Sequence, residues 1–225
     1  MTWYLWAMIF AGLALALAYQ RGRKVNLALI HRVSEALERA FEPDDKLYTW
    51  IGGLVGFHAK YHFESGPVER IEATVTLLPR HSPLFMPISW LLFRSDRLFL
   101  TAFLREPLRG EWHVMTRSRL RRLSRELSAR NLEQQDFPEP VEGDFLLLAP
   151  RNGQGERAGE GPDDLASALA RLVASQGPAA RRLVHLALVP DRHTVFLFHR
   201  GLDSVEAAAR LLLAVVSLVG AASDD

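Results

Sequence analysis

An uncharged segment near the start of the chain constrains its structure more than any other feature. Residues 3–19 contain no charged side chain. As a helix rising about 1.5 Å per residue, this segment reaches roughly 25 Å, which suffices for a thin bilayer. Aromatic rings, which favour the headgroup level, mark both ends, and basic residues follow directly. The aromatic and basic residues of this predicted anchor are Trp3, Trp6, Tyr19, Arg21, Arg23 and Lys24.

The basic residues also set the expected orientation. They follow the segment, whereas no basic residue precedes Trp3. The positive-inside rule therefore places the N-terminus outside and all later residues in the cytoplasm. We expect a single-pass protein of the cell membrane whose main domain is cytoplasmic. Two alternatives are a secretory signal peptide, because residues 14–16 (Ala-Leu-Ala) resemble a cleavage site, and a helix buried in a soluble fold.

Charge divides the chain into two parts. Residues 1–130 hold 19 Lys and Arg against 12 Asp and Glu, a net +7, whereas residues 131–225 hold 8 against 14, a net −6. This asymmetry predicts a basic face rather than a uniformly basic protein. The chain has no cysteine, which excludes disulfide scaffolds, thiolate metal sites and cysteine nucleophiles.

The hydrophobic pattern predicts three regions: an anchor with its basic stop segment at 1–24, an amphipathic linker helix at 25–45, and a cytosolic domain at 46–225 with a sub-boundary near 132–143. In that domain, alternation and turn residues predict a series of strands and helices. The expected strands are 46–63, 68–78, 97–105, 112–116, 145–149, 183–189 and 194–199; the expected helices are 118–131, 162–176 and 203–219.

The order of these elements indicates the fold class. Hairpin turns are expected at 64–67, 106–111 and 190–192. Strands and helices interleave, yet hairpins recur. We therefore expect an α+β or α/β domain with a mixed sheet and flanking helices behind a single transmembrane helix.

Sequence patterns for catalysis or metal binding are weak. His58 and His62 lie in a predicted strand, where they would be about 13 Å apart and too far to share an ion. Residues 153–161 are rich in glycine but lack the lysine and the spacing of a phosphate-binding loop. We expect the side chains of His185, His193 and His199 to be hydrogen-bonded within the fold or to face the solvent. We expect no catalytic residues, no metal and no cofactor, and hence no enzyme.

Two segments do suggest contacts. Residues 117–130 hold six arginines against one acidic residue, and on a helix most of these would project toward phosphates of RNA or of anionic lipid, unless they form an ordinary solvated face. Residues 84–93 are apolar and fit the membrane interface, a partner helix or the protein core. The candidate phosphate or partner contacts are Arg117, Arg119, Arg121, Arg122, Arg125 and Arg130. The candidate apolar contacts are Phe85, Met86, Trp90 and Phe93.

The order of short sequence words resembles the calumin family, the coiled-coil-domain-containing subunit of the PAT complex of the multipass translocon. The resemblance covers roughly residues 46–200. It rests on the single span, a strand with residues 48–50 (Tyr-Thr-Trp) and glycines, residues 95–97 (Ser-Asp-Arg) leading a strand, the helix at 119–127, and the hairpin at 183–200. This chain lacks the family's acidic lumenal segment and its long C-terminal coiled coil, so we expect a reduced form.

These features lead to one favoured function and two alternatives. We expect a membrane-anchored cytosolic adaptor that acts in protein insertion or as a chaperone beside the Sec translocon. The resemblance implies translocon or insertase subunits as partners, and the charge of the basic helix suggests ribosome binding through ribosomal RNA; no DNA partner is expected. One alternative is a membrane-anchored enzyme or small-ligand-binding protein with a pocket near the Gly-rich loop. The other is a protein that binds the surface of anionic lipid.

Overall fold

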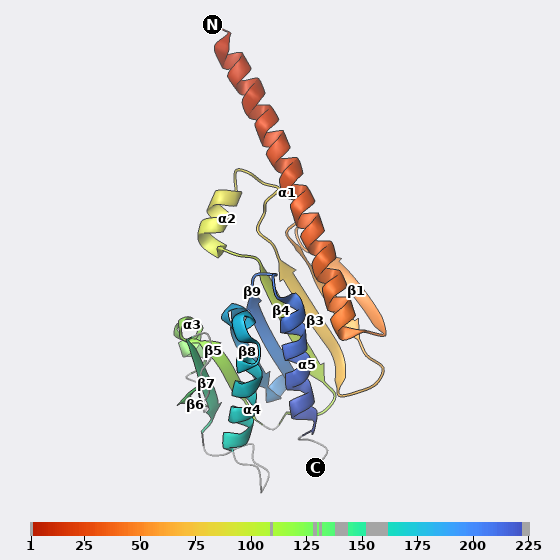
Figure 1. Ribbon diagram of the computed structural model, residues 1–225, viewed down its shortest axis with the longest axis vertical. Helices are drawn as coiled ribbons and strands as arrows, with labels where there is room; N and C mark the ends of the chain where they lie inside the picture. Colours follow the sequence, from red (N-terminus) through yellow and green to blue (C-terminus); the bar gives the residue numbers. More distant parts are fainter. Residues whose placement is uncertain are drawn as a thin grey trace.

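A computed structural model describes residues 2–108, 110–127, 130, 132–137, 144–151 and 162–221. Groups of strands are separated by helices along the chain (Figure 1). The helices are α1 (Trp3–Phe41), α2 (Met86–Phe93), α3 (Arg117–Leu127), α4 (Pro162–Ala174) and α5 (Val205–Ala221), with short 3-10 helices at η1 (Gly177–Arg182) and η2 (Pro190–Arg192). The strands are β1 (Asp45–Trp50), β2 (Gly56–His62), β3 (Val68–Thr76), β4 (Arg97–Leu104), β5 (Trp112–Thr116), β6 (Leu132–Asp136), β7 (Phe145–Pro150), β8 (Leu183–Val189) and β9 (Thr194–Arg200).

Helix α1 is a single helix of 39 residues. The expected boundary between an anchor at 1–24 and a linker helix at 25–45 is therefore wrong in one respect, since the two form one element. No proline occurs before Pro43 to interrupt the helix. Its end is set by Glu42, which has a left-handed φ of 47° and donates its backbone N–H to the carbonyl of Glu38.

The strands form one nine-stranded sheet in the order β1-β2-β3-β4-β9-β8-β5-β7-β6. Every described strand pair in it is antiparallel. The α+β class is thus confirmed, whereas the mixed sheet was wrong. The reason is the topology, in which the β8–β9 hairpin lies between β4 and β5. The connection from β4 to β5 passes over these two strands, and each strand still pairs antiparallel with its neighbours.

Three details of the strand prediction were wrong. The segment 46–63 forms two strands, because Gly52 and Gly53 adopt positive φ angles and make a turn rather than a bend within one strand. Strands β4 and β5 are not a hairpin, since β9 and β8 separate them. Strand β6 was missed, because its polar sequence lacks the hydrophobic alternation of a half-buried strand.

The main core lies on one face of the sheet, under α5, α4 and the C-terminal half of α1 (Figure 1). Alternate residues of the central strands point into it, as in β4, where Leu98, Leu100 and Ala102 are fully buried. Helix α5 contributes Leu212 and Val215, so its apolar segment packs inside the fold.

Two contacts fasten α1 to the sheet. Near its C-terminus, the Glu38 carboxylate accepts hydrogen bonds from Tyr48 Oη (2.6 Å) and Lys46 Nζ (2.5 Å), both on β1. Farther up the helix, Gly22 lies so close to the segment after β3 that a Cβ there would be 1.9 Å from the carbonyl oxygen of Arg80. Only a glycine allows this approach.

We predict that Gly22→Ala lowers the thermal midpoint of the full chain in detergent micelles. The methyl group would push α1 away from Arg80, at a cost of about 1–3 kcal/mol in unfolding free energy. The matched control is Gly12→Ala, at a glycine of the same helix where a Cβ meets no atom within 4 Å. That variant should keep or slightly raise the midpoint, because alanine favours a helix more than glycine does. Equal effects of the two substitutions would contradict the close contact.

Candidate membrane-contact site

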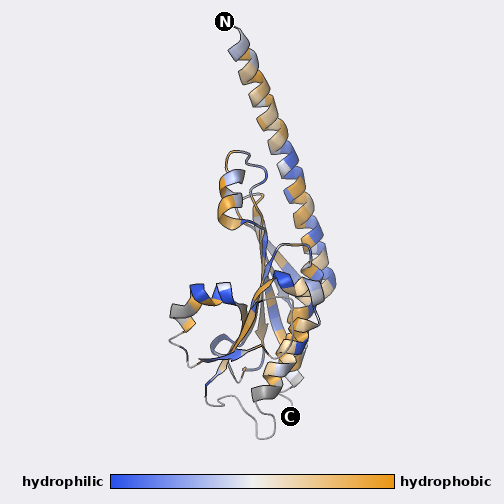
Figure 2. Cartoon of the chain, turned by 60° about the vertical axis from the view of Figure 1, so that its left-hand side comes forward, coloured by the Kyte–Doolittle hydropathy of each residue, from blue (hydrophilic) through white to orange (hydrophobic). Residues whose placement is uncertain are grey.

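The first half of α1 projects from the domain, and its large apolar side chains are exposed (Figures 1 and 2). Large apolar side chains of residues 3–19, here called the candidate span, are 43–77% exposed. In the described part of the chain, α1 is the one helix long and apolar enough to cross a membrane. Its apolar window is not buried anywhere in the fold, so the alternative of a core helix in a soluble protein is wrong.

The candidate span ends where α1 meets the domain, at a region that we call the neck. The neck consists of Tyr19, Gly22, Asn26, Leu54, Leu78, Arg80, His81 and Asp96. The Tyr19 and His81 rings pack edge to face at 6.2 Å. The predicted basic residues Arg21, Arg23 and Lys24 are exposed at this level, as expected for the end of a membrane segment, and Figure 2 shows the hydrophilic band that they form.

Asn26 is the centre of the neck. Its side chain is fully buried, and its Nδ2 donates to the carbonyls of Leu54 (2.8 Å) and Leu78 (2.9 Å). Its Oδ1 accepts a hydrogen bond from Arg80 Nη1 at 3.2 Å. Arg80 in turn makes a bidentate ion pair with Asp96, from Nη1 to Oδ1 at 2.9 Å and from Nη2 to Oδ2 at 2.8 Å. One polar side chain thus joins α1 to the β1–β2 turn and to the segment after β3.

Helix α2 begins a few residues beyond the neck and has no buried residue. Three of its four predicted contact residues are exposed, namely Phe85, Trp90 and Phe93, whereas Met86 is half-buried. The neighbouring Leu84, Ile88, Leu91 and Leu92 are also exposed. The interpretation of residues 84–93 as part of the core is therefore wrong. The sequence could not decide this, because the apolar side chains of this segment are distributed all around the helix axis.

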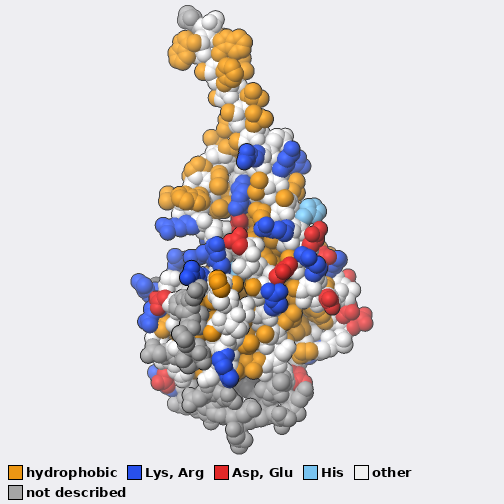
Figure 3. Space-filling model, viewed as in Figure 1, with side chains coloured by type: hydrophobic (Ala, Val, Ile, Leu, Met, Phe, Trp, Pro, Cys, Tyr) orange, Lys and Arg blue, Asp and Glu red, His pale blue; other side chains and the backbone are white. Residues whose placement is uncertain are grey.

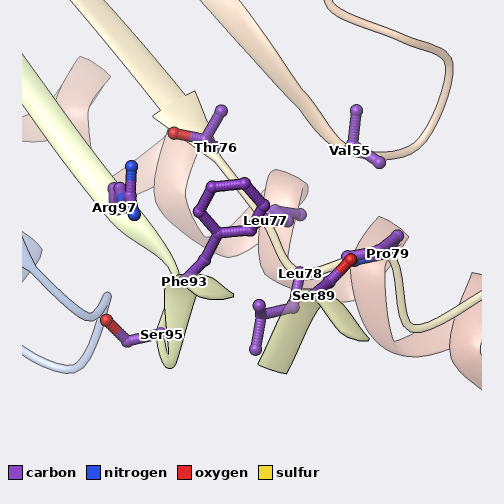
Figure 4. A pocket seen from close by; sticks show the side chains of 9 residues that line it. All are labelled: Val55, Thr76, Leu77, Leu78, Pro79, Ser89, Phe93, Ser95 and Arg97. Carbon is purple, nitrogen blue, oxygen red and sulfur yellow. The ribbon is translucent and has the colours of Figure 1, made fainter. Parts of the chain in front are cut away.

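A pocket of about 270 Å³ separates α2 from the ends of β3 and β4 (Figure 4). Its lining is mainly apolar, with Arg97 at one side, where the guanidinium carbon lies 4.9 Å from the centre of the Phe93 ring. This volume is smaller than most ligand sites. The pocket expected near the Gly-rich loop falls on residues 152–161, outside the described residues. The lining residues are Val55, Thr76, Leu77, Leu78, Pro79, Ser89, Phe93, Ser95 and Arg97.

The structure divides the six predicted arginine contacts. Arg117 pairs with Asp144 (2.6 Å), and Arg130, which lies beyond the end of α3, pairs with Glu111. The Arg119 guanidinium lies 5.7 Å from the centre of the Phe198 ring on β9. Arg121 and Arg122 are exposed on α3, and the side chain of Arg125 is outside the described residues. The exposed basic surface of α3 is therefore smaller than the sequence suggests.

The opposite face of the sheet holds a buried pair of histidines that the sequence did not single out as a pair. His113 Nδ1 of β5 lies 3.0 Å from His185 Nε2 of β8, and His113 Nε2 lies 2.8 Å from Glu111 Oε1. His185 and His199 are buried rather than solvent-facing, while His193 is exposed in the β8–β9 turn. Only the register of non-adjacent strands brings His113 and His185 together.

Burial lowers the pKa of both paired histidines, because it penalises the charged imidazolium. For His185 the pKa falls to about 3, with His113 and Arg119 as further causes. For His113 the carboxylate of Glu111 opposes the downward shift in pKa. The described residues contain no group of three or more side chains placed to hold a metal ion. The histidine pair can share a proton through its hydrogen bond.

We predict that the pair makes the unfolding free energy depend on pH. Below the ordinary histidine pKa of 6.5 the unfolded chain takes up protons that folded His185 refuses. The contribution of His185 to the unfolding free energy is thus complete above pH 6.5. It falls as the pH drops toward 3, by about 2 kcal/mol between pH 6.5 and 5. Denaturant unfolding in micelles should show a smaller pH dependence for His185→Asn than for the parent. The exposed control His31→Asn should match the parent; identical behaviour of all three would contradict the assignment.

We also predict that Asn26→Leu destabilises the neck by about 3 kcal/mol, because two buried carbonyls lose their donor and Arg80 loses an acceptor. The measurement is the denaturant midpoint of the full chain in micelles. Gln20→Leu is the control, since it makes a similar change at an exposed position of α1. If both variants unfold at the parent's midpoint, Asn26 does not hold α1 in place.

Comparisons with known proteins do not assign this chain to a family. No protein-family model matches the chain, and no curated protein matches it. The geometry and chemistry of its own residues are therefore the basis for a functional assignment.

Proposed function

We propose that this chain is a membrane-anchored adaptor, which holds its α+β domain at the cytoplasmic face beside proteins that are being inserted and folded in the bilayer. The observation that carries the proposal is the unbroken α1, which runs from the candidate span to Phe41 in the core. A flexible linker would let a domain move freely, whereas a continuous helix fixes its distance and orientation relative to the membrane. Fixed placement is what an adaptor requires.

The geometry of α1 also supports an uncleaved anchor over a signal peptide. The helix passes through the alanine-rich residues 14–18 without a break. Tyr19 and Gly22, which follow at once, are in contact with the domain. Cleavage there would remove the helix immediately before the neck. The basic residues after the span support the cytoplasmic placement of the domain.

The resemblance to the calumin family supports translocon or insertase subunits as the partners. Arg121 and Arg122 are the candidate contacts for an acidic partner or for ribosomal RNA, because both are exposed on α3. The domain would act by holding and positioning these partners, without bond chemistry.

The test is to crosslink intact membranes, purify the tagged full chain in mild detergent and identify what accompanies it. We expect Sec-channel subunits, insertase relatives or ribosomal proteins. The double variant Arg121→Glu with Arg122→Glu should recover markedly less of them. The matched control is Arg192→Glu with Arg210→Glu, which reverses two exposed arginines on other elements and should leave recovery unchanged.

Two results would contradict this function. Recovery of the chain alone, or with metabolic enzymes only, would exclude the role in membrane-protein insertion. Equal loss of partners from both double variants would show that total charge matters rather than the α3 surface.

A further inference from the structure

Helix α2 presents an apolar surface that no described part of the protein covers. Seven large side chains in residues 84–93 are between 50% and 74% exposed, and the helix buries none of its own residues. Contiguous apolar surface of this kind marks a place of contact with lipid or with another protein. Figure 3 shows it as an apolar area on the upper part of the domain, below the projecting span.

The neck holds α2 at the level where the candidate span ends. The segment from Leu77 to α2 passes directly against α1, with His81 on Tyr19 and the carbonyl of Arg80 against Gly22. Asn26 fixes the same segment through the carbonyl of Leu78. Helix α2 thus lies beside α1, below the projecting span (Figure 1).

A neighbouring turn adds to the same apolar end. The β1–β2 turn at residues 51–55 has the uncharged sequence Ile-Gly-Gly-Leu-Val and follows the exposed Trp50. It joins the neck through the carbonyl of Leu54, and Val55 lines the pocket beneath α2.

Charge at this end complements an anionic surface. Residues 1–34 and 73–95 contain no Asp or Glu, but they carry five Arg and Lys residues besides the paired Arg80. The first acidic residue after α2, Asp96, is neutralised by Arg80. Exposed carboxylates also lie at the other ends of the strands, among them Asp44, Glu64 and Asp191. Besides the paired Arg80, the cations of the apolar end in these two ranges are Arg21, Arg23, Lys24, Arg32 and Arg94.

We propose that α2 lies in the headgroup region of the bilayer as a second membrane contact beside the span, with anionic phospholipid as its partner. This inference rests on the proposed anchoring of α1. Apolar side chains of α2 would enter the boundary between headgroups and acyl chains, Trp90 would lie at the interface, and Arg94 would reach the phosphates. Two contacts at separate points, joined by the neck, hold the sheet at a defined angle to the membrane.

The absence of cysteine from the sequence allows a direct test with single-cysteine variants of the full chain. Leu91→Cys reports on α2, Leu13→Cys on the span, and Asp191→Cys on the remote β8–β9 turn. Each is labelled with an environment-sensitive fluorophore and reconstituted in vesicles of phosphatidylcholine and phosphatidylglycerol that contain a lipid-borne quencher. We expect shallow quenchers to act on the Leu91→Cys label, deep quenchers on the Leu13→Cys label, and neither on the Asp191→Cys label.

The outcomes separate this inference from the anchor. Quenching at position 13 without quenching at position 91 would leave the anchor standing and overturn the role of α2. No quenching at either position would overturn both. A blue-shifted label at position 91 that lipid-borne quenchers do not reach would overturn the lipid contact and indicate a protein, such as a second copy, on α2.

A second variant tests whether the apolar side chains cause the contact. Leu91→Glu with Leu92→Glu adds two negative charges at exposed positions, so the fold should be unchanged by circular dichroism. A label at Ile88→Cys in this background should lose its lipid quenching, while a label at Leu13→Cys keeps it. Retained quenching at position 88 would overturn the proposal.

Discussion

The buried amide of Asn26 is the interaction on which the arrangement of this protein depends. Its hydrogen bonds reach the β1–β2 turn, the segment after β3 and, through Arg80, the start of β4 at Asp96. Buried polar groups are costly unless every one of them is paired, so this network tolerates few alternative geometries. It therefore holds α1 at one angle against the sheet, in the same region where the helix loses its protein contacts and becomes fully exposed.

A rigid exit for α1 gives the domain two different ends. At one end lie the candidate span, α2 and the uncharged β1–β2 turn, with arginines and lysines around them. At the other end lie polar turns with exposed carboxylates. A domain on a flexible tether would gain little from this difference. Because α1 is continuous, each end keeps its position relative to the membrane, and the apolar end always faces it in the proposed arrangement.

The sequence predicted most helices and strands, but fewer of the contacts between them. Strands β3, β5, β8 and β9 and helix α5 follow the hydrophobic pattern closely, because each has one buried face and clear turn residues. Strand β6 escaped notice because its side chains are polar. The candidate site divides in the same way. Exposure of the span follows from local composition, whereas the exposure of α2 and the ion pairs of Arg117 and Arg130 with residues distant in sequence depend on the tertiary structure.

The sequence by itself determined a single apolar, cation-flanked segment, a domain in which strands and helices interleave, and the absence of cysteine chemistry. These properties depend on composition and on short-range periodicity, which are visible along one strand or helix. Only the tertiary structure decided that anchor and linker are one helix, that β8 and β9 separate β4 from β5, and that His113 meets His185. Each of these depends on which distant residues become neighbours, and pairing across a sheet is a long-range property that local patterns do not encode.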